Sequence, residues 1–502
     1  MNRNARFFLI SLFWILSILL IPGLSVYSDT WNAYQHDLQH TGFTSEAPEL
    51  PLEIKWHATL CPWMNGGLSP IVSDGTYSVV GAFRDYDTLF PQSTENLKVW
   101  CVRNNDGSIA WQFETGGIVV GSPQIAGDKV YVVSWDSRES EDDPYASSLW
   151  ALRLSNGSVA WEKHFEERWA SPPAVKDDIL VVPVMYKPFL QNADGVLYAY
   201  NATSGFPLWN YPALDRMISD DWFPNRPNPP CIYDNRVYFQ DTRNVYAVNL
   251  TDGSDAWTTN SAQGLEFWEL GRALVAADGK LFFVDTNVHV EGDARIVCLR
   301  ADNGKGLWQW LKQGEEWSSS RISGVSYANG IVYASLSWTQ VNDAIVAIDG
   351  ITGGMIRRSP TGGSVARTPI ITGEGNVIYL CYRSWILNPQ MDQILFDFTD
   401  DHGMLLYGDY GEPALANSLV ITGLHPYDLD NFYLTAFGHD TTPPVADITK
   451  PQGTLTNPGK IDISGFATDF NFDYWELSYA RLEDTNNWTI LTSDTQRKNY
   501  EG

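Results

Sequence analysis

The sequence predicts an all-β fold, an eight-bladed β-propeller, and three observations support that prediction. Tryptophans recur at intervals of 50, 48, 48 and 51 residues. A glycine stands four positions before each of them, and an alanine or cysteine stands ten positions before. Short runs rich in valine, isoleucine and tyrosine alternate with glycine, asparagine and aspartate, as in strands joined by hairpins. A period of about 50 residues is typical of propellers, solenoids and arrays. The recurring tryptophans are Trp111, Trp161, Trp209, Trp257 and Trp308.

One copy of the repeat contains the four strands of a blade. It opens at Ser122-Pro123 and turns at Gly127-Asp128. The turn at Asn156-Gly157 then precedes the final strand, which ends at Trp161. No helical periodicity of useful length appears after residue 30. Four short strands per unit are typical of a propeller blade.

The count of units is eight, with seven as the alternative. The strand around Trp56 lacks the beginning of its unit, and residues 411–438 lack a closing strand. Pairing the two closes the ring and leaves no open sheet edge. Arg357 replaces the sixth tryptophan, and Leu406 and His402 replace the seventh tryptophan and its glycine. The seven other units begin near residues 69, 122, 171, 229, 270, 321 and 367.

The repeated tryptophans have a structural interpretation. A large aromatic at the end of the outer strand covers the gap between neighbouring blades, and the small residue ten positions earlier leaves room for it. Repeated core positions of this kind serve packing. We therefore exclude these tryptophans from the candidate site.

The repeat resembles the tryptophan-docking repeat of the quinoprotein alcohol dehydrogenase-like (PQQ-like) propellers. Residues 197–200, Leu-Tyr-Ala-Tyr, with Gly205 and Trp209, form the copy most similar to that repeat. The lead-in, with Trp31, His36-Asp37 and His40-Thr41-Gly42, also resembles the segment before the first blade of such proteins. The resemblance covers residues 31–440 and implies the fold. The family contains pyrroloquinoline-quinone (PQQ) alcohol dehydrogenases, an outer-membrane-protein assembly lipoprotein and surface proteins.

Charge and the N-terminus indicate an extracytoplasmic protein. The net charge is −27, without a cluster of lysine and arginine, which excludes nucleic acid as a partner and disfavours an anionic membrane surface. Residues 1–28 resemble a secretory signal, with Arg3 and Arg6 before an apolar stretch. We expect a secreted, periplasmic or cell-surface protein that does not insert in a membrane once the signal is cleaved. An uncleaved anchor helix is the alternative interpretation.

Cysteines and acidic residues bear on cofactors. The five cysteines are odd in number and irregular in spacing, which does not indicate a disulfide framework, and Cys101 and Cys298 occupy the small position of the repeat. The PQQ dehydrogenases that the resemblance suggests carry a vicinal cysteine pair, which this chain lacks, so PQQ is not expected. Calcium is possible at Asp136, Asp142 and Asp143, for which a solvated acidic loop is the competing interpretation.

The chain divides into a signal at 1–28, a propeller at 29–440 and a C-terminal part at 441–502. The linker Thr441–Pro444 leads into strand-like segments punctuated by proline and glycine. They resemble the start of a bacterial or archaeal immunoglobulin-like surface module. Such a sandwich needs about 100 residues. Since about 60 remain, we expect the sequence to end inside this domain.

The candidate ligand site lies on one face of the ring. Connections between second and third strands, and between blades, emerge on the same face and are long, whereas the other turns are tight. Long loops on a rigid scaffold often carry function. Aromatic and arginine side chains there suit sugars or planar ligands, with inter-blade packing as the competing interpretation. The long segments are 81–97, 134–148, 183–196, 212–228, 284–295, 335–344 and 382–393. The candidate ligand-binding residues are Trp63, Trp135, Trp169, Trp222, Trp268, Trp317, Trp338, Arg168, Arg321 and Arg367.

These features favour a secreted or cell-surface scaffold that binds an extracellular glycan, cell-wall polymer or protein. The alternative is an extracellular enzyme using the same face, either a PQQ-dependent dehydrogenase-like protein or one that acts on polysaccharides. No catalytic residue is identified, and we lean against catalysis. The sequence contains no nucleophile elbow and no phosphate loop.

Overall fold

The computed structural model contains only strands, turns and bridges in the residues it describes. Within those ranges no helix is long and apolar enough to cross a membrane. The signal predicted at 1–28 lies outside them. The described residues are 30–62, 67–83, 98–136, 146–166, 168–186, 194–215, 229–240, 244–259, 273–286, 294–311, 321–337, 344–359, 367–380, 384–398, 412–424, 431–443, 445–450, 464–468, 475–481, 484–494 and 499–500.

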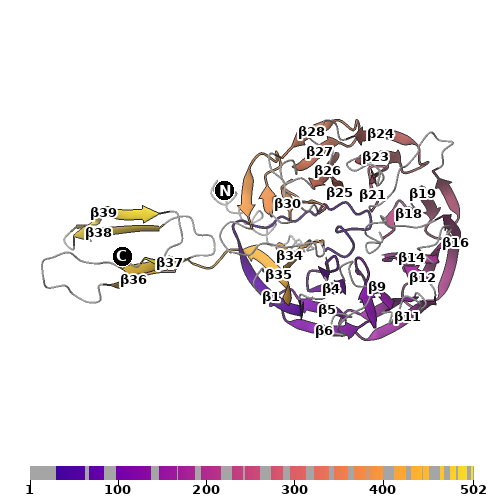
Figure 1. Cartoon of the computed structure of the whole chain (residues 1–502), viewed down its shortest axis with the longest axis horizontal. Coiled ribbons are helices and arrows are strands. Elements are labelled where there is room, and N and C mark those ends of the chain that lie inside the picture. Colours follow the sequence, from indigo (N-terminus) through magenta and orange to yellow (C-terminus); the bar gives the residue numbers. More distant parts are fainter. Residues whose placement is uncertain are drawn as a thin grey trace, which may run out of the picture.

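Eight antiparallel sheets form a ring, which confirms the eight-bladed propeller (Figure 1). In blades 1 to 3 the innermost strand is split in two. Blade 1 contains β2 (Gly67–Leu68), β3 (Val72–Ser73), β4 (Tyr77–Phe83), β5 (Lys98–Arg103) and β6 (Ile109–Glu114). Blade 2 contains β7 (Gly117–Val119), β8 (Gln124–Ala126), β9 (Lys129–Asp136), β10 (Ala146–Arg153) and β11 (Val159–Glu166). Blade 3 contains β12 (Arg168–Ala170), β13 (Ala174–Lys176), β14 (Ile179–Tyr186), β15 (Asp194–Asn201) and β16 (Pro207–Asp215).

Blades 4 to 7 have four strands each. Blade 4 contains β17 (Cys231–Tyr233), β18 (Arg236–Gln240), β19 (Val245–Asn249) and β20 (Asp255–Thr258). Blade 5 contains β21 (Val275–Ala277), β22 (Lys280–Thr286), β23 (Ala294–Arg300) and β24 (Gly306–Leu311). Blade 6 contains β25 (Arg321–Ala328), β26 (Ile331–Ser337), β27 (Ala344–Asp349) and β28 (Met355–Arg358). Blade 7 contains β29 (Ile370–Ile371), β30 (Val377–Tyr379), β31 (Trp385–Leu387) and β32 (Ile394–Asp397).

Blade 8 joins the two ends of the ring, as the sequence predicts. Three of its strands come from the C-terminal side, and the outer strand is β1, from the N-terminal side. In the register of this pairing Trp56 lies opposite Ala436, the same tryptophan–alanine pairing that the other blades repeat. The ring is therefore closed by hydrogen bonds between distant parts of the chain. The strands of blade 8 are β33 (Ala414–Ala416), β34 (Leu419–Leu424), β35 (Asn431–His439) and β1 (Leu52–Pro62).

Six of the joints between blades seat a tryptophan on a glycine turn of the next blade. Trp111 of blade 1 donates from Nε1 to the carbonyl oxygen of Leu154 in blade 2 over 2.7 Å. A Cβ atom on Gly157, in the same turn, would lie 2.6 Å from the indole, and the φ of Gly157 is 71°, so only glycine fits there. Trp56, Trp161, Trp209, Trp257 and Trp308 make the same two contacts, with carbonyl acceptors Asn104, Ala202, Leu250, Ala301 and Gly350.

The small residue of the repeat lies under the tryptophan of its own blade, which confirms its predicted role. Ala151 pairs directly with Trp161, and Cys298 with Trp308. Cys101, opposite Trp111, is likewise buried with a free thiol. Burial raises the pKa of the Cys101 and Cys298 thiols well above the ordinary range, so both remain protonated and unreactive.

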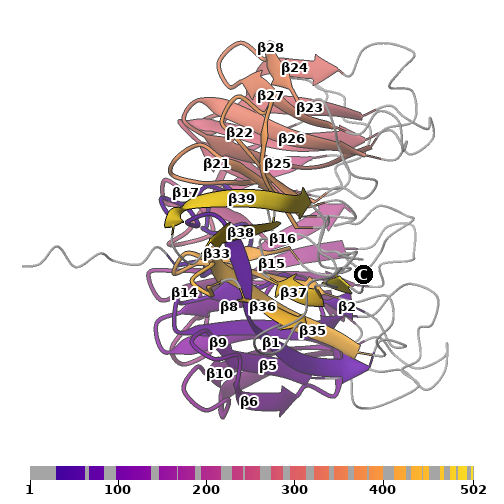
Figure 2. The same cartoon turned by 90° about the vertical axis from the view of Figure 1, so that its left-hand side faces the viewer.

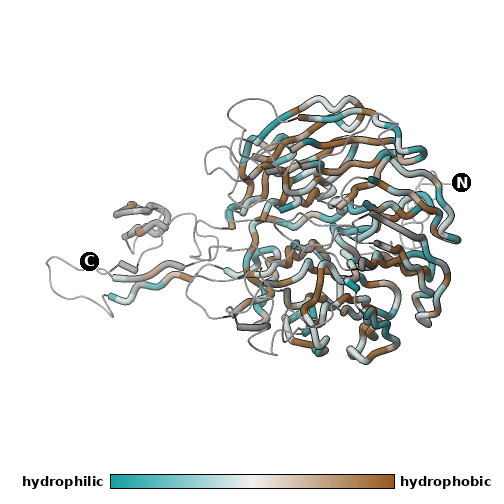
Figure 3. The backbone as a smooth tube through the Cα atoms, turned by 45° about the vertical axis from the view of Figure 1, so that its right-hand side comes forward, coloured by the Kyte–Doolittle hydropathy of each residue, from teal (hydrophilic) through white to brown (hydrophobic). Residues whose placement is uncertain are grey.

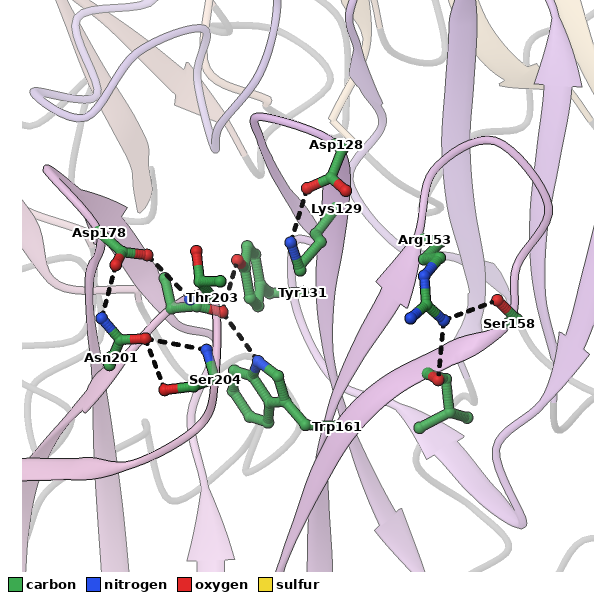
Figure 4. A network of polar contacts seen from close by, with 12 residues as sticks. Asp128, Lys129, Tyr131, Arg153, Ser158, Trp161, Asp178, Asn201, Thr203 and Ser204 are labelled. Atoms are coloured by element: carbon green, nitrogen blue, oxygen red, sulfur yellow. Dashed lines mark hydrogen bonds and ion pairs between the residues drawn. The ribbon is translucent and has the colours of Figure 1, made fainter.

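The joint between blades 2 and 3 shows how the polar groups of the tight turns are satisfied (Figure 4). The carbonyl oxygen of Ala202 accepts from both Trp161 Nε1, at 2.8 Å, and Tyr131 Oη, at 3.0 Å. Asp178, from the first turn of blade 3, accepts hydrogen bonds from the side chain of Asn201 and, at 2.8 Å, from the backbone N–H of Thr203. The two tight turns of the blade are thus bonded to each other.

Arg357 replaces the tryptophan at the joint between blades 6 and 7 and keeps its hydrogen bond. Its Nη1 donates to the carbonyl oxygen of Pro389 over 2.6 Å, at the position that accepts from tryptophan elsewhere. Arg357 also lies opposite Ala347, in the repeated register. The arginine therefore keeps the hydrogen bond to the next blade but lacks the packing surface of an indole.

Blade 7 corrects two sequence predictions. Its fourth strand is β32, in which Phe396 pairs with Ile386 at the register position of the tryptophan, so Leu406 and His402 are not the replacements expected. The range 382–393 is also not a single long loop, because it contains β31 and a turn with Met391. The reason is that the interval from Arg357 to Phe396 is shorter than the interval between successive tryptophans, so the last strand of blade 7 lies nearer the N-terminus than a fixed spacing predicts. Leu406 and His402 lie outside the described residues.

The apolar residues concentrate along the strands of the ring (Figure 3). The buried side chains gather in clusters that span neighbouring blades rather than in one central core. Val120, Leu149 and Leu180, for example, share one cluster between blades 2 and 3. Because each blade is covered by its neighbours, the ring as a whole provides the hydrophobic stabilisation of every sheet.

The C-terminal part lies beside the ring, next to β35 and β1 (Figure 1). It has a three-stranded sheet and a two-stranded sheet. The immunoglobulin-like assignment stays a prediction, as do the domain limits 29–440 and 441–502. The strands are β36 (Val445–Lys450), β37 (Ser464–Thr468), β38 (Trp475–Arg481), β39 (Asp484–Asp494) and β40 (Asn499–Tyr500).

Candidate functional site

The strands of every blade run between two faces of the ring, seen edge-on in Figure 2. The face on which β9 ends at Asp136 and β12 begins at Arg168 is called the long-loop face. The opposite face, which carries the turns at Asp128 and Asn156, is the tight-turn face. The antiparallel order of the strands places equivalent ends of all blades on the same face.

A segment from the N-terminal side crosses the ring axis on the tight-turn face. This segment, residues 30–46, is called the strap, and its trace runs through the middle of the ring in Figure 1. Innermost strands of blades 1, 2, 4, 5, 6 and 7 donate backbone hydrogen bonds to it, just before their tight turns. The donors are Ser73, Ile125, Ile232, Ala276, Tyr327 and Ile371, and the acceptors are the carbonyls of Trp31, Asn32, Leu38, Gln39, Thr41 and Gly42.

Blade 3 receives a side chain where six other blades receive the strap. Gln124 of blade 2 accepts from the backbone N–H of Val175 through Oε1 at 2.7 Å. Its Nε2 donates to the carbonyl oxygen of Val175 over 3.2 Å. An amide side chain thus mimics a strand partner. The inner edge of the ring on this face is therefore paired around most of its circumference.

His40 anchors the strap. It is buried, and its Nδ1 lies 2.9 Å from the carbonyl oxygen of Leu274 in blade 5. Since a carbonyl oxygen only accepts, Nδ1 carries the hydrogen. Burial lowers the pKa of His40 from 6.5 to about 4, against the smaller opposing effects of the Leu274 hydrogen bond and the Asp37 carboxylate. The imidazole is neutral near neutral pH.

Two predicted ligand-binding tryptophans pack against each other on the long-loop face. The rings of Trp135, at the end of β9, and Trp169, in β12, stack with centroids 4.1 Å apart and planes 22° apart. Trp135 Nε1 donates to the carbonyl oxygen of Ala170 over 2.9 Å. Both side chains are buried. The two tryptophans connect blade 2 to blade 3, and neither indole ring is exposed to solvent.

Arg168 lies beside this pair. Its Nη1 donates to Tyr198 Oη over 2.5 Å, and its carbonyl oxygen accepts from Ser147 Oγ at 3.0 Å. Arg168 is half-buried, and its guanidinium bonds within its own blade. Arg168 is therefore a cation held at the rim of the joint between blades 2 and 3.

Blade 5 carries a buried ion pair that the sequence analysis missed. Asp285 is fully buried, and its Oδ2 lies 2.6 Å from Arg295 Nη2 and 2.6 Å from Arg295 Nε. Arg295 Nη1 donates to Gln309 Oε1 over 2.8 Å. Asp285 and Arg295 are direct cross-strand partners. A buried aspartate needs such a partner, so an acidic residue within the apolar β22 was the available signal.

The remaining predicted residues are only partly placed. Arg367 is buried just before β29, and its carbonyl oxygen accepts from Ser335 Oγ at 2.6 Å. Arg321 begins β25 and Asp136 ends β9, both on the long-loop face, and nothing is described of their side chains. The residues outside the described ranges are Trp63, Trp222, Trp268, Trp317, Trp338, Asp142 and Asp143.

The described cysteine, histidine and acidic residues bear on the quinone and calcium that the sequence analysis considered. Among them no three His, Cys, Asp or Glu side chains gather to hold a metal ion. The described cysteines with free thiols, Cys101, Cys231 and Cys298, are buried in three different blades. No vicinal pair exists in the sequence. No catalytic step through quinone or calcium is therefore derived for this chain.

Two curated relatives match part of the chain. The dehydrogenase-named protein XoxF of Paracoccus denitrificans is 25% identical over 237 residues, 45% of this chain and 36% of the relative. The outer membrane protein assembly factor BamB of Moranella endobia is 22% identical over 279 residues, 53% of this chain and 61% of the relative. The chain thus spans between one third and two thirds of the length of these relatives.

A family model and a solved structure agree with the ring. A quinohemoprotein alcohol dehydrogenase from Pseudomonas putida HK5 superposes with a TM-score of 0.61 at 12% identity, over 86% of this chain and 82% of that one, which shows the fold alone. The family model described as outer membrane protein assembly factor BamB matches residues 53–167 and 146–311. Together these matches span just over half of the 502 residues. The chain therefore belongs to the family described as outer membrane protein assembly factor BamB, whose fold is the PQQ-like β-propeller.

Proposed function

We propose that the chain is a secreted, periplasmic or cell-surface scaffold that binds a protein partner on the long-loop face. The observation that carries this proposal is the strap. Its backbone bonds to six blades occupy the inner edge of the ring on the tight-turn face. The backbone groups of those inner edges are already hydrogen-bonded to the strap. We therefore assign partner binding to the long-loop face.

Two considerations favour a protein over a glycan or cell-wall polymer. The family and one of the relatives take their name from assembly of outer membrane proteins. In addition, Trp135 and Trp169 are buried against each other, so these two rings offer no stacking platform to a sugar. A glycan or cell-wall polymer remains a distinguishable outcome of the experiment below.

The experiment compares opposite ends of the same strands. A photo-crosslinking amino acid replaces Glu114, Glu166 or Leu311, all exposed where β6, β11 and β24 reach the long-loop face. The matched control positions are Ser108, Ser158 and Lys305, exposed where the same strands leave the tight-turn face. We expect adducts with one partner protein from the first set only, identified by mass spectrometry. Adducts from the control set alone would contradict the proposal, and adducts that contain only glycan would replace the protein partner.

An enzyme that uses the same face is the second candidate, favoured by the similarity to the dehydrogenase-named relative. The purified chain is incubated with the quinone and Ca²⁺, and its absorbance and dye-linked alcohol oxidation are measured. We expect neither bound quinone nor oxidation. A bound quinone with alcohol-dependent dye reduction would establish the dehydrogenase instead of the scaffold.

A further inference from the structure

Two of the seating turns contain an asparagine directly before the buried glycine. Asn156-Gly157 receives Trp111 of blade 1, and Asn303-Gly304 receives Trp257 of blade 4. The equivalent residues in the other seating turns are Asp106, Ser204, Asp252 and Thr352. An Asn-Gly sequence is the dipeptide most prone to deamidation, because glycine does not shield its own backbone nitrogen. The chemistry of these two joints is therefore different from that of the others.

In both turns the side-chain amide of the asparagine is exposed, whereas the backbone nitrogen of the following glycine is covered. Asn156 and Asn303 are exposed, whereas Gly157 and Gly304 are buried. The N–H of Gly157 donates to the carbonyl oxygen of Arg153 over 2.8 Å, and a Cβ atom on this glycine would lie 2.6 Å from the indole of Trp111. Asn156 Oδ1 accepts from the N–H of Ser158 at 3.0 Å. Arg153 and Ser158, which flank this turn, are seen in Figure 4.

The second turn has the same contacts. The N–H of Gly304 donates to the carbonyl oxygen of Arg300 over 2.9 Å. A Cβ atom on Gly304 would lie 2.6 Å from the indole of Trp257. Asn303 Oδ1 accepts from the N–H of Lys305 at 3.0 Å. The equivalence allows one turn to serve as the control for the other.

Deamidation requires the backbone nitrogen of the glycine, which is covered in both turns. The glycine backbone nitrogen loses its proton and attacks Cγ of the asparagine, the side-chain ammonia leaves, and a succinimide forms. Water then opens the ring at one of its two carbonyls, which gives aspartate or isoaspartate. While the tryptophan is seated, the attacking nitrogen is hydrogen-bonded and the turn cannot rotate toward Cγ.

We propose that Asn156 and Asn303 are deamidation sites that the seated tryptophans Trp111 and Trp257 hold inactive. Each site reports on a single joint: opening of the joint between blades 1 and 2 releases Asn156, and opening of the joint between blades 4 and 5 releases Asn303. Because local opening is rarer than exposure of the side chain, the rate follows the joint and not the surface.

Aspartate and isoaspartate, the two products, affect a joint differently. Aspartate fits, because Asp106 and Asp252 already occupy the same position and accept from the N–H groups of Ser108 and Ser254 at 2.9 Å. Side-chain and backbone hydrogen bonds from Ser108 lower the pKa of Asp106, so the turn favours the carboxylate. Isoaspartate adds a methylene to the backbone, which moves the glycine away from the indole. Formation of isoaspartate therefore loosens the joint irreversibly.

The test is a crossover between two variants of the full chain. Wild type, Trp111→Ala and Trp257→Ala are held at neutral pH, and deamidation at each asparagine is followed by peptide mapping with mass spectrometry. We expect Trp111→Ala to accelerate the reaction at Asn156 by about tenfold or more without changing it at Asn303, and Trp257→Ala to do the reverse. Equal rates at both asparagines in all three proteins would overturn the proposal.

A second measurement does not depend on whether the variants fold. The wild-type chain is held at the same pH with and without denaturing urea. We expect both asparagines to react about tenfold or more slowly in the folded chain than in the unfolded one. A folded rate that matches the unfolded rate would show that the seated tryptophans protect neither site.

Discussion

The two faces of the ring use their polar groups in opposite ways. On the tight-turn face, backbone groups are satisfied within a few residues, by the strap, or by tryptophan and tyrosine from the neighbouring blade, as at Ala202. On the long-loop face, charges such as Asp285 and Arg168 are held by side chains from other strands of their own blades. The repeated tryptophan joints therefore lie on the tight-turn face, whereas the contact between Trp135 and Trp169 joins blades 2 and 3 on the long-loop face.

The largest effect is expected at a seated tryptophan. Trp257→Ala removes a buried indole and its hydrogen bond to Ala301 and should lower the free energy of unfolding by about 3–5 kcal/mol. The control is Leu311→Ala, an exposed residue at the long-loop end of β24, with an expected effect within about 0.5 kcal/mol. Chemical denaturation measures both. Equal effects would mean that the joints do not stabilise the ring.

Acid should weaken the strap. The folded pKa of His40 is about 4, below its ordinary value of 6.5, so the unfolded chain binds the proton more readily. The contribution to stability is complete above pH 6.5 and is lost as the pH falls from 6.5 to 4, on the order of 3 kcal/mol. His40→Asn should remove this part of the pH dependence. An identical pH profile in wild type and variant would show that His40 does not couple the strap to protonation.

The carboxylate of Glu53 should act in the same direction at lower pH. Glu53 lies in β1 and accepts from Lys55 Nζ at 2.5 Å and from Thr442 Oγ1 at 2.6 Å, where the linker leaves β35. Burial alone would raise the pKa of Glu53, but these hydrogen bonds lower it from 4.5 to about 2. The stabilisation is present above pH 4.5 and is lost between pH 4.5 and 2. Hydrogen exchange at the Thr441 amide, compared between wild type and Glu53→Gln, measures it, with exposed Glu49→Gln as the control.

A smaller effect is expected where arginine replaces the tryptophan. Arg357→Met keeps the aliphatic part of the side chain and removes the hydrogen bond to Pro389, which should cost about 1–2 kcal/mol. Arg358→Met, at the next and exposed position of β28, should leave the unfolding midpoint unchanged. If both variants behave alike, the Arg357 hydrogen bond does not hold blades 6 and 7 together.

Much of the fold could be predicted because the repeat is regular where packing demands it. The spacing of the tryptophans and of Ala151 and its equivalents predicted the blades, the closing strand around Trp56 and a small residue that leaves room for each tryptophan. The seat of each tryptophan, Gly157 and its equivalents, recurs in the sequence as well. Its contact could not be predicted, because periodicity shows which residues recur and not which residues of another blade they touch.

In blade 7 and at the candidate site, the repeat was not sufficient to predict the structure. A fixed spacing from Arg357 leads to Leu406, whereas the structure places Phe396 at that position, after a shorter interval. Trp135 and Trp169 were predicted to bind ligand, and the structure shows them stacked across a joint. An aromatic in a long connection has the same sequence signature whether it packs or binds. Only the fold distinguishes the two.

The comparison between the faces is tested most directly by the affinity for the crosslinked partner. One double variant, Trp222→Ala with Trp317→Ala, changes aromatics in the connections assigned to the long-loop face. The other, Ser108→Ala with Ser254→Ala, changes exposed turns of the tight-turn face. We expect the first to weaken binding by about tenfold or more with an unchanged unfolding midpoint, and the second to bind as wild type does. Loss of binding in the serine variant, with the tryptophan variant unaffected, would contradict the assignment of function to the long-loop face.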